Sequence, residues 1–103
     1  MPRSLTEQTF HEALIGTPGL MMVDFWADRC GPSQAIAPVL DELASQGRVT
    51  LMTVNVDENP ELATRYSIGS IPTILFVKHG KVVDRIVGAA SKALLQAIVT
   101  ARA

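Results

Sequence analysis

The sequence predicts an α/β fold with a central mixed β-sheet and flanking helices, and three features carry this prediction. Residues 20–26 form a near-continuous apolar run, which is typical of a strand buried on both faces. A helical pattern joins this run to a second apolar run at residues 49–56, which indicates a parallel pair with a right-handed crossover. Residues 73–77 and 81–87 are separated by a tight hairpin signal, so they add antiparallel strands.

Four helices are expected around these strands. Their expected starts are Thr6, Pro32 or Ser33, Asp57 or Asn59, and Ser91. In the last helix, Leu94, Leu95 and Ile98 have helical spacing and are expected to face inward.

The composition limits the classes of function. A chain of 103 residues, 48% of them hydrophobic, is expected to form a single domain over residues 1–103 with its own core. The net charge of −1 without a basic block argues against nucleic acid and against an anionic membrane surface as partners. No apolar run approaches the ~20 residues of a membrane helix, and no signal peptide is visible, so a cytoplasmic protein is expected. It is also expected to be a monomer. No His or Cys has metal-ligand spacing, and no cofactor is expected.

Cys30 is the only cysteine, so an internal disulfide is excluded. It directly precedes a predicted helix, where free backbone N–H groups and the helix dipole favour negative charge and lower a thiol pKa. Arg29 adds a cation beside it. Cys30 is therefore a candidate nucleophile rather than an inert core cysteine, whereas a plain solvated side chain fits Arg29 equally well.

Asp24 lies within the first apolar strand. A buried carboxylate is costly unless it is paired, so its pKa is expected to rise above the ordinary value. A hydrogen-bonded structural aspartate remains the alternative interpretation.

Several separated segments occur in an order that carries a specific resemblance. They are residues 23–27, 30–32, 36–40, 54–57, 59–60, 71–73 and 87–89. On these segments, almost the whole chain resembles the thioredoxin family. The resemblance implies a thioredoxin fold with a sheet of four or five strands, the first short or missing, and a cis peptide bond before Pro72. It also implies protein disulfides as substrates and thioredoxin reductase as a partner.

The resemblance also assigns roles to individual residues. Cys30 is the nucleophile, Asp24 corresponds to a proton acceptor and donor, and Ser33 occupies the position of a resolving cysteine. The active-site loop and the substrate groove would be formed by Trp26, Arg29, Gly31, Pro32, Gly69, Ser70, Ile71, Pro72, Gly88 and Ala89. For Ile71, ordinary core packing is nearly as good an interpretation.

Three departures from the family pattern bear on function. Ser33 replaces the second cysteine of Cys-Gly-Pro-Cys, Arg29 replaces the usual tryptophan, and Thr53 stands where a lysine often lies near the buried aspartate. A serine hydroxyl cannot resolve a mixed disulfide, so the proton-transfer role of Asp24 is in doubt and covalent complexes should be trapped. Ser33 fits either an engineered replacement or a natural one-cysteine protein.

Three functions therefore remain open. The leading one is a thioredoxin-type disulfide reductase that carries out only the first half-reaction. The second is a redox-inactive thioredoxin-fold module that binds proteins through the groove. The third is a monothiol reductase resolved by glutathione, although Arg29 is the only cation expected near the groove.

Overall fold

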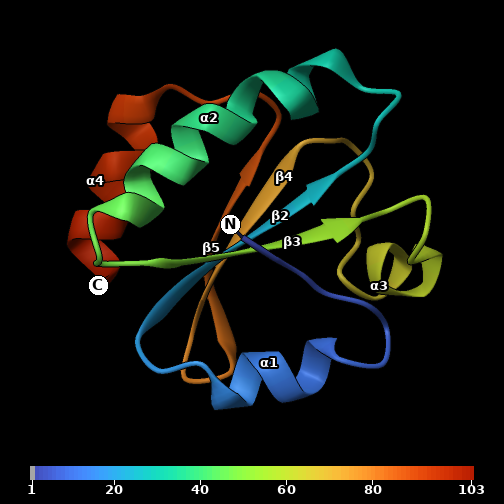
Figure 1. Cartoon of the computed structure of the whole chain (residues 1–103), viewed down its shortest axis with the longest axis horizontal. Helices are drawn as coiled ribbons and strands as arrows, with labels where there is room; N and C mark the ends of the chain where they lie inside the picture. Colours follow the sequence, from blue (N-terminus) through green and yellow to red (C-terminus); the bar gives the residue numbers. More distant parts are fainter. Residues whose placement is uncertain (1) are drawn as a thin grey trace.

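The computed structural model describes residues 2–103, and within them it shows a five-stranded mixed sheet and four helices (Figure 1). The elements are β1 (Arg3–Ser4), α1 (Phe10–Gly16), β2 (Leu20–Trp26), α2 (Gly31–Ser45), β3 (Thr50–Asn55), α3 (Pro60–Arg65), β4 (Thr73–Lys78), β5 (Lys81–Val87) and α4 (Lys92–Arg102). The strand order is β1-β3-β2-β4-β5. The expected fold is confirmed, including the parallel β2–β3 pair joined through α2 and the antiparallel β4–β5 hairpin.

The first strand is present but very short, within the range that the sequence predicted. Arg3 and Ser4 pair in parallel with Met52 and Thr53 of β3. The Leu5 N–H then donates to the Thr53 carbonyl at 2.7 Å, and this is the last backbone bond between the N-terminal segment and β3.

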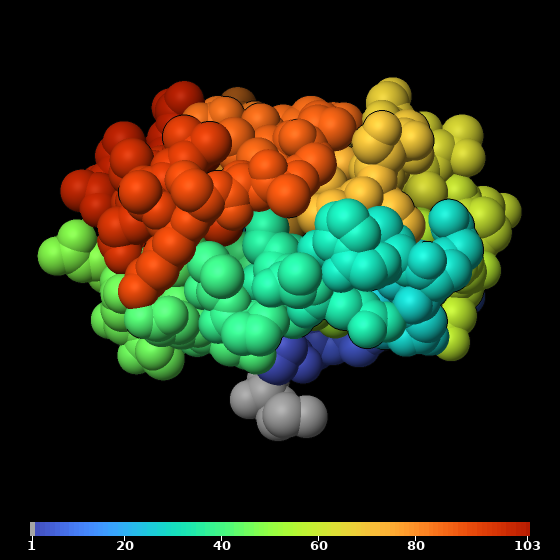
Figure 2. Space-filling model, turned by 90° about the horizontal axis from the view of Figure 1, so that it is seen from above, coloured from blue at the N-terminus to red at the C-terminus, as the bar shows by residue number. Residues whose placement is uncertain are grey.

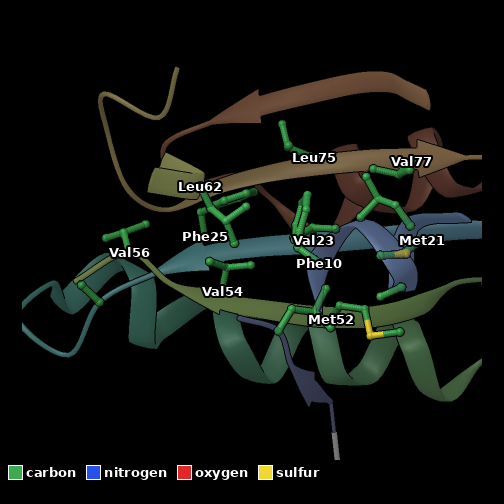
Figure 3. Close-up of a cluster of buried hydrophobic side chains, with 14 residues drawn as sticks. Phe10, Met21, Val23, Phe25, Met52, Val54, Val56, Leu62, Leu75 and Val77 are labelled. Carbon is green, nitrogen blue, oxygen red and sulfur yellow. The ribbon is translucent and has the colours of Figure 1, made fainter. Parts of the chain in front are cut away.

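Strand β2 lies at the centre of the sheet, and this explains its unbroken apolar run. Side chains alternate between the two faces of a strand. Met21, Val23 and Phe25 pack in the core beneath α1 and α3, which Figure 3 shows, whereas Leu20 and Met22 pack beneath α2 and α4. By the same alternation, Asp24 and Trp26 belong to the face that α2 covers.

The hairpin between β4 and β5 has the geometry that its sequence favours. His79 and Gly80 form a two-residue connection, and both have positive φ, of 54° and 79°. A two-residue turn with two positive φ angles matches the right-handed twist of the strands that it joins.

The expected start of the first helix is wrong by one turn. Thr6 does not cap α1. Its N–H donates to Thr9 Oγ1 at 2.9 Å, and its carbonyl accepts from the Thr9 N–H at 3.1 Å. These bonds form a turn that leads directly into α1, since the Thr6 carbonyl also accepts from the Phe10 N–H at 2.9 Å, and α1 begins at Phe10.

Leu94 is also placed differently from the expectation. The Ser91 hydroxyl accepts from the Leu94 N–H at 3.2 Å, so the predicted cap is confirmed. However, the inward face of α4 is formed by Leu95 and Val99, both fully buried and one turn apart, while Leu94 is 46% exposed. One residue of a helix turns by about 100°, which carries Leu94 to the edge of the apolar face.

Candidate functional site

Cys30 is the N-cap residue of α2. Its backbone is extended, with φ −115° and ψ 108°, and its carbonyl accepts the first helical bond from the Gln34 N–H at 3.3 Å. Pro32 lies in the first turn, where a missing N–H costs nothing because that group has no partner within the helix. The chain geometry therefore presents a partly exposed thiol at the open end of a 15-residue helix.

The surroundings of Cys30 favour its ionised form. The Ser33 side chain, followed by the Ser33 backbone N–H, lowers the pKa of the Cys30 thiol, and the positive charge of Arg29 adds to this. Partial burial of the sulfur opposes these effects but does not cancel them. The net result is a thiol more acidic than a free cysteine, as the sequence predicted.

The protonated and ionised thiols use different partners. The Cys30 Sγ donates to the Ile71 carbonyl at 3.5 Å, while Ser33 Oγ is buried without a hydrogen-bond partner among residues 2–103. When the proton leaves, the sulfur becomes an acceptor, and the Ser33 hydroxyl and N–H are the donors available to it. Ser33 therefore acts on the thiolate more than on the thiol.

The loop before β4 lies directly against the start of α2 (Figure 2, gold beside cyan). The peptide bond between Ile71 and Pro72 is cis, as the resemblance implied. The Gly88 N–H donates to the Pro72 carbonyl at 2.8 Å, and Gly88 has φ +84°, a conformation that favours glycine. The structure thus brings Cys30, Ile71, Pro72 and Gly88 into one continuous region.

The other expected groove residues make no side-chain hydrogen bond with Cys30 within residues 2–103. Ser70 and Ala89 are exposed, and the Ser70 carbonyl accepts from Thr73 Oγ1 at 2.6 Å, which fixes the loop to β4. Gly31 and Pro32 are exposed at the start of α2. Trp26 is half-buried, and its ring nitrogen is buried without a hydrogen-bond partner among residues 2–103.

A cavity of about 300 Å³ lies behind the thiol, between α2 and the sheet. Asp24, Trp26 and Ser33 line it, together with Pro2, Gln34, Ala37 and Thr53. Asp24 Oδ1, Trp26 Nε1 and Ser33 Oγ are all buried, and none has a hydrogen-bond partner within the described residues. Three residues with a buried polar atom that lacks a partner therefore line the same cavity.

The carboxyl group of Asp24 is the most strongly perturbed group of this cavity. It is 3% exposed, with Thr53 and Ile74 beside it on the neighbouring strands. Burial raises the pKa of Asp24 to about 7, and the negative charge of Asp41 contributes further. Thr53 supplies no positive charge, so the missing cation at that position is consistent with the raised pKa.

Arg29 forms an ion pair that the sequence reasoning missed. Its Nε lies 3.1 Å from Asp57 Oδ2, and its Nη2 lies 3.2 Å from Asp57 Oδ1. Both side chains remain at least half exposed. The pair could have been predicted from the expected parallel pairing of β2 with β3, because the residues that follow two parallel neighbouring strands lie at the same edge of the sheet.

Asp41 was missed as well, and helical spacing could have identified it. Ser33, Ala37 and Asp41 are separated by four residues each, so they lie along one side of α2. Since Ser33 and Ala37 line the cavity beside Asp24, the third member of the series brings a like charge toward the same carboxyl group.

Two kinds of feature are absent from residues 2–103: a membrane-spanning helix and a metal-binding cluster of side chains. None of their helices combines the length and apolar character needed to cross a membrane. Within the same residues, His, Cys, Asp and Glu side chains form no group of three or more that could hold a metal ion.

Comparison with known proteins identifies the family. The family model described as Thioredoxin matches residues 1–101. The chain belongs to the thioredoxin family. It is 44% identical over 93 residues to Thioredoxin 1 of Nostoc sp., which covers 88% of this chain and 87% of that protein. Thioredoxins are disulfide oxidoreductases, so the protein is of the thioredoxin redox type.

Two further relatives agree with this assignment. Thioredoxin 2 of Chlorobaculum tepidum is 45% identical over 92 residues, covering 87% of this chain and 84% of the relative. Thioredoxin M-type, chloroplastic, of Pisum sativum is 44% identical over 93 residues, covering 88% of this chain and 54% of that longer protein.

Proposed function

We propose that this family member attacks protein disulfides with Cys30 and, lacking a second cysteine, stops at the mixed disulfide. The observation that supports this most directly is the position of the sulfur, at the N-terminus of α2 and 3.5 Å from the Ile71 carbonyl beside Pro72. A thiolate there is stabilised by Ser33 and Arg29 and remains partly exposed to a partner.

The proposed step balances as a simple exchange. The Cys30 thiolate attacks one sulfur of a substrate disulfide, a new S–S bond forms to Cys30, and the old S–S bond breaks. The Cys30 sulfur is oxidised, the departing sulfur is reduced, and the leaving thiolate takes a proton from water. Residues beside Pro72 and Gly88 would hold the extended substrate segment through their exposed backbone groups.

Ser33 determines the fate of the mixed disulfide. Its hydroxyl cannot attack the S–S bond, so release needs a thiol from outside the chain. In this proposal, Asp24 has no resolving thiol to deprotonate, and thioredoxin reductase is a partner only for a dithiol form such as Ser33→Cys. We place this activity in one domain, in a monomer and in the reducing cytoplasm.

The decisive experiment compares the present sequence with Ser33→Cys. With a disulfide substrate, intact-mass analysis should show a covalent adduct on the present protein that dithiothreitol removes. Insulin reduction coupled to thioredoxin reductase should be absent for the present protein and restored by Ser33→Cys, because residues 30 and 33 are one helical turn apart.

The same experiment separates the alternatives. An adduct that reduced glutathione releases at a steady rate would favour a glutathione-resolved monothiol reductase. If neither protein forms an adduct or reduces insulin, Cys30 is not an accessible nucleophile, and a redox-inactive binding module becomes the better description.

A further inference from the structure

Arg29 presents a guanidinium group that is only partly used. Asp57 occupies the edge formed by Nε and Nη2. The remaining nitrogen, Nη1, makes no hydrogen bond with any residue in the range 2–103, although it carries two N–H donors. The Arg29 side chain is 66% exposed, so this free edge is open to solvent.

A pocket of about 340 Å³ has Arg29 and Ile71, the residue beside the Cys30 thiol, among its lining residues. Arg29 and Asp57 line one part of it, and Ile68, Gly69 and Ile71 line another. Ile71 is also the residue whose carbonyl accepts from the Cys30 thiol. A substrate cysteine joined to Cys30 therefore places its own sequence neighbours at the mouth of this pocket, since adjacent residues are about 3.8 Å apart.

The Arg29–Asp57 pair also shows that the guanidinium can bind a carboxylate in this position. Two roughly parallel N–H···O contacts to a carboxylate are the geometry in which arginine recognises such groups. Exposed ion pairs contribute little net stability, so Asp57 can share or yield the guanidinium at small cost. Of the nine Lys and Arg side chains, Arg29 alone adjoins Cys30 in the sequence.

We propose that Arg29 is a specificity-determining residue that selects disulfides whose attacked cysteine has an acidic residue next to it in the substrate protein. Asp57 holds the guanidinium in place and competes with the substrate carboxylate for it. This inference rests on the proposed attack by Cys30 and adds the class of substrate that is attacked fastest.

The test uses short peptides with one cysteine flanked by Glu, Gln or Lys, each activated as a pyridyl disulfide. Attack by the Cys30 thiolate joins it to the peptide sulfur and breaks the peptide–pyridyl S–S bond. The leaving group is released as thiopyridone, whose absorbance gives the rate. Ratios between peptides are compared at one pH, because the thiolate fraction of each variant then cancels.

The Glu peptide should react about two- to fivefold faster than the Gln peptide, a modest factor because exposed charge pairs are weak. This ratio should shrink as salt is added. It should fall to about one in Arg29→Gln and rise in Asp57→Asn, which removes the competing carboxylate. Glu58→Gln is the matched control. It deletes the same charge one residue away, and Asp57, not Glu58, is the carboxylate on Arg29.

Each other outcome overturns a stated part of the inference. Equal rates for all three peptides would show that Arg29 does not select carboxylates. A faster Lys peptide would show instead that negative charge, such as that of Asp57, dominates beside Cys30. If the ratio of the Glu-peptide rate to the Gln-peptide rate rises equally in Glu58→Gln and Asp57→Asn, Asp57 does not compete specifically for Arg29. Pyridyl-activated glutathione could instead be the substrate whose reaction rate depends on Arg29, while the rate of the Glu peptide does not. The carboxylate that Arg29 recognises would then belong to glutathione and not to an acidic protein. If no peptide reacts, the proposed function itself fails.

Discussion

The buried carboxyl group of Asp24 gives the sharpest quantitative prediction. Its pKa is raised from 3.8 to about 7, chiefly by burial. One pKa unit corresponds to about 1.4 kcal/mol, so ionised Asp24 opposes folding by an amount on the order of 4 kcal/mol, an upper bound since local relaxation reduces it. Asp24→Asn removes this charge, and we expect it to raise the free energy of unfolding at pH 8 by about 2–4 kcal/mol.

The sign of the pH dependence follows from the same shift. The folded state binds this proton more tightly than the unfolded chain, so the destabilisation is absent well below pH 3.8. It grows as the pH rises from 3.8 to about 7 and is complete above that value. The parent protein should lose stability from this group across that window, and Asp24→Asn should not.

Urea unfolding measured at several pH values tests this prediction. Asp41→Asn is a useful second variant, because the Asp41 charge is the smaller cause of the shift. It should reduce the loss of stability in the parent protein but have no such effect when Asp24 is already Asn. An Asp24→Asn protein that is less stable at pH 8 than the parent would refute the reasoning, since it would mean that the carboxylate is stabilised by a partner.

Two further predictions concern the thiol and the N-terminal segment. Ser33→Ala removes the side chain that is the largest cause of the lowered Cys30 pKa. The midpoint of the alkylation rate plotted against pH should therefore move to higher pH. An unchanged midpoint would mean that the helix N-terminus and Arg29 cause the acidity instead. The Glu7 carboxylate accepts from the Glu61 N–H at 2.9 Å and so caps α3 from outside the helix. Glu7→Ala should therefore cost about 0.5–1 kcal/mol in urea unfolding, while Glu7→Gln, which keeps an acceptor, should cost less. Equal losses in the two variants would contradict the capping role.

Much of the fold could be predicted because local signals and burial agree. The run at residues 20–26 is apolar on both faces because β2 lies between β3 and β4, with helices above and below. The Ser91 cap and the turn at His79 and Gly80 are specified by residues within a few positions of one another. Such features need no knowledge of distant contacts.

The errors arise where a distant or competing contact decides. Thr6 has the chemistry of a cap, yet its N–H is bonded to the Thr9 hydroxyl and residues 7–9 form a turn, so the helix begins later. Leu94 has helical spacing, but the rotation of α4 is fixed by the burial of Leu95 and Val99 against the sheet. Neither outcome is encoded in the spacing alone.

In the candidate site, too, some features follow from the local sequence and others depend on distant contacts. The position of Cys30 at a helix start follows from the local sequence, and so does the burial of Asp24 in a strand. The Arg29–Asp57 pair joins residues 28 positions apart, and it needs the parallel pairing of β2 with β3 before it can be foreseen. The cavity needs the register of α2 over the sheet, which sets Ser33 against Asp24 and Trp26.

The combination of Ser33 with a buried acid changes what Asp24 can contribute. Without a second thiol, Asp24 has no sulfur to deprotonate, but it still lines the cavity behind Ser33, with a pKa of about 7. Its ionisation places a negative charge behind the residue that most stabilises the Cys30 thiolate. Like charges disfavour each other, so we expect ionised Asp24 to make the Cys30 thiolate harder to form.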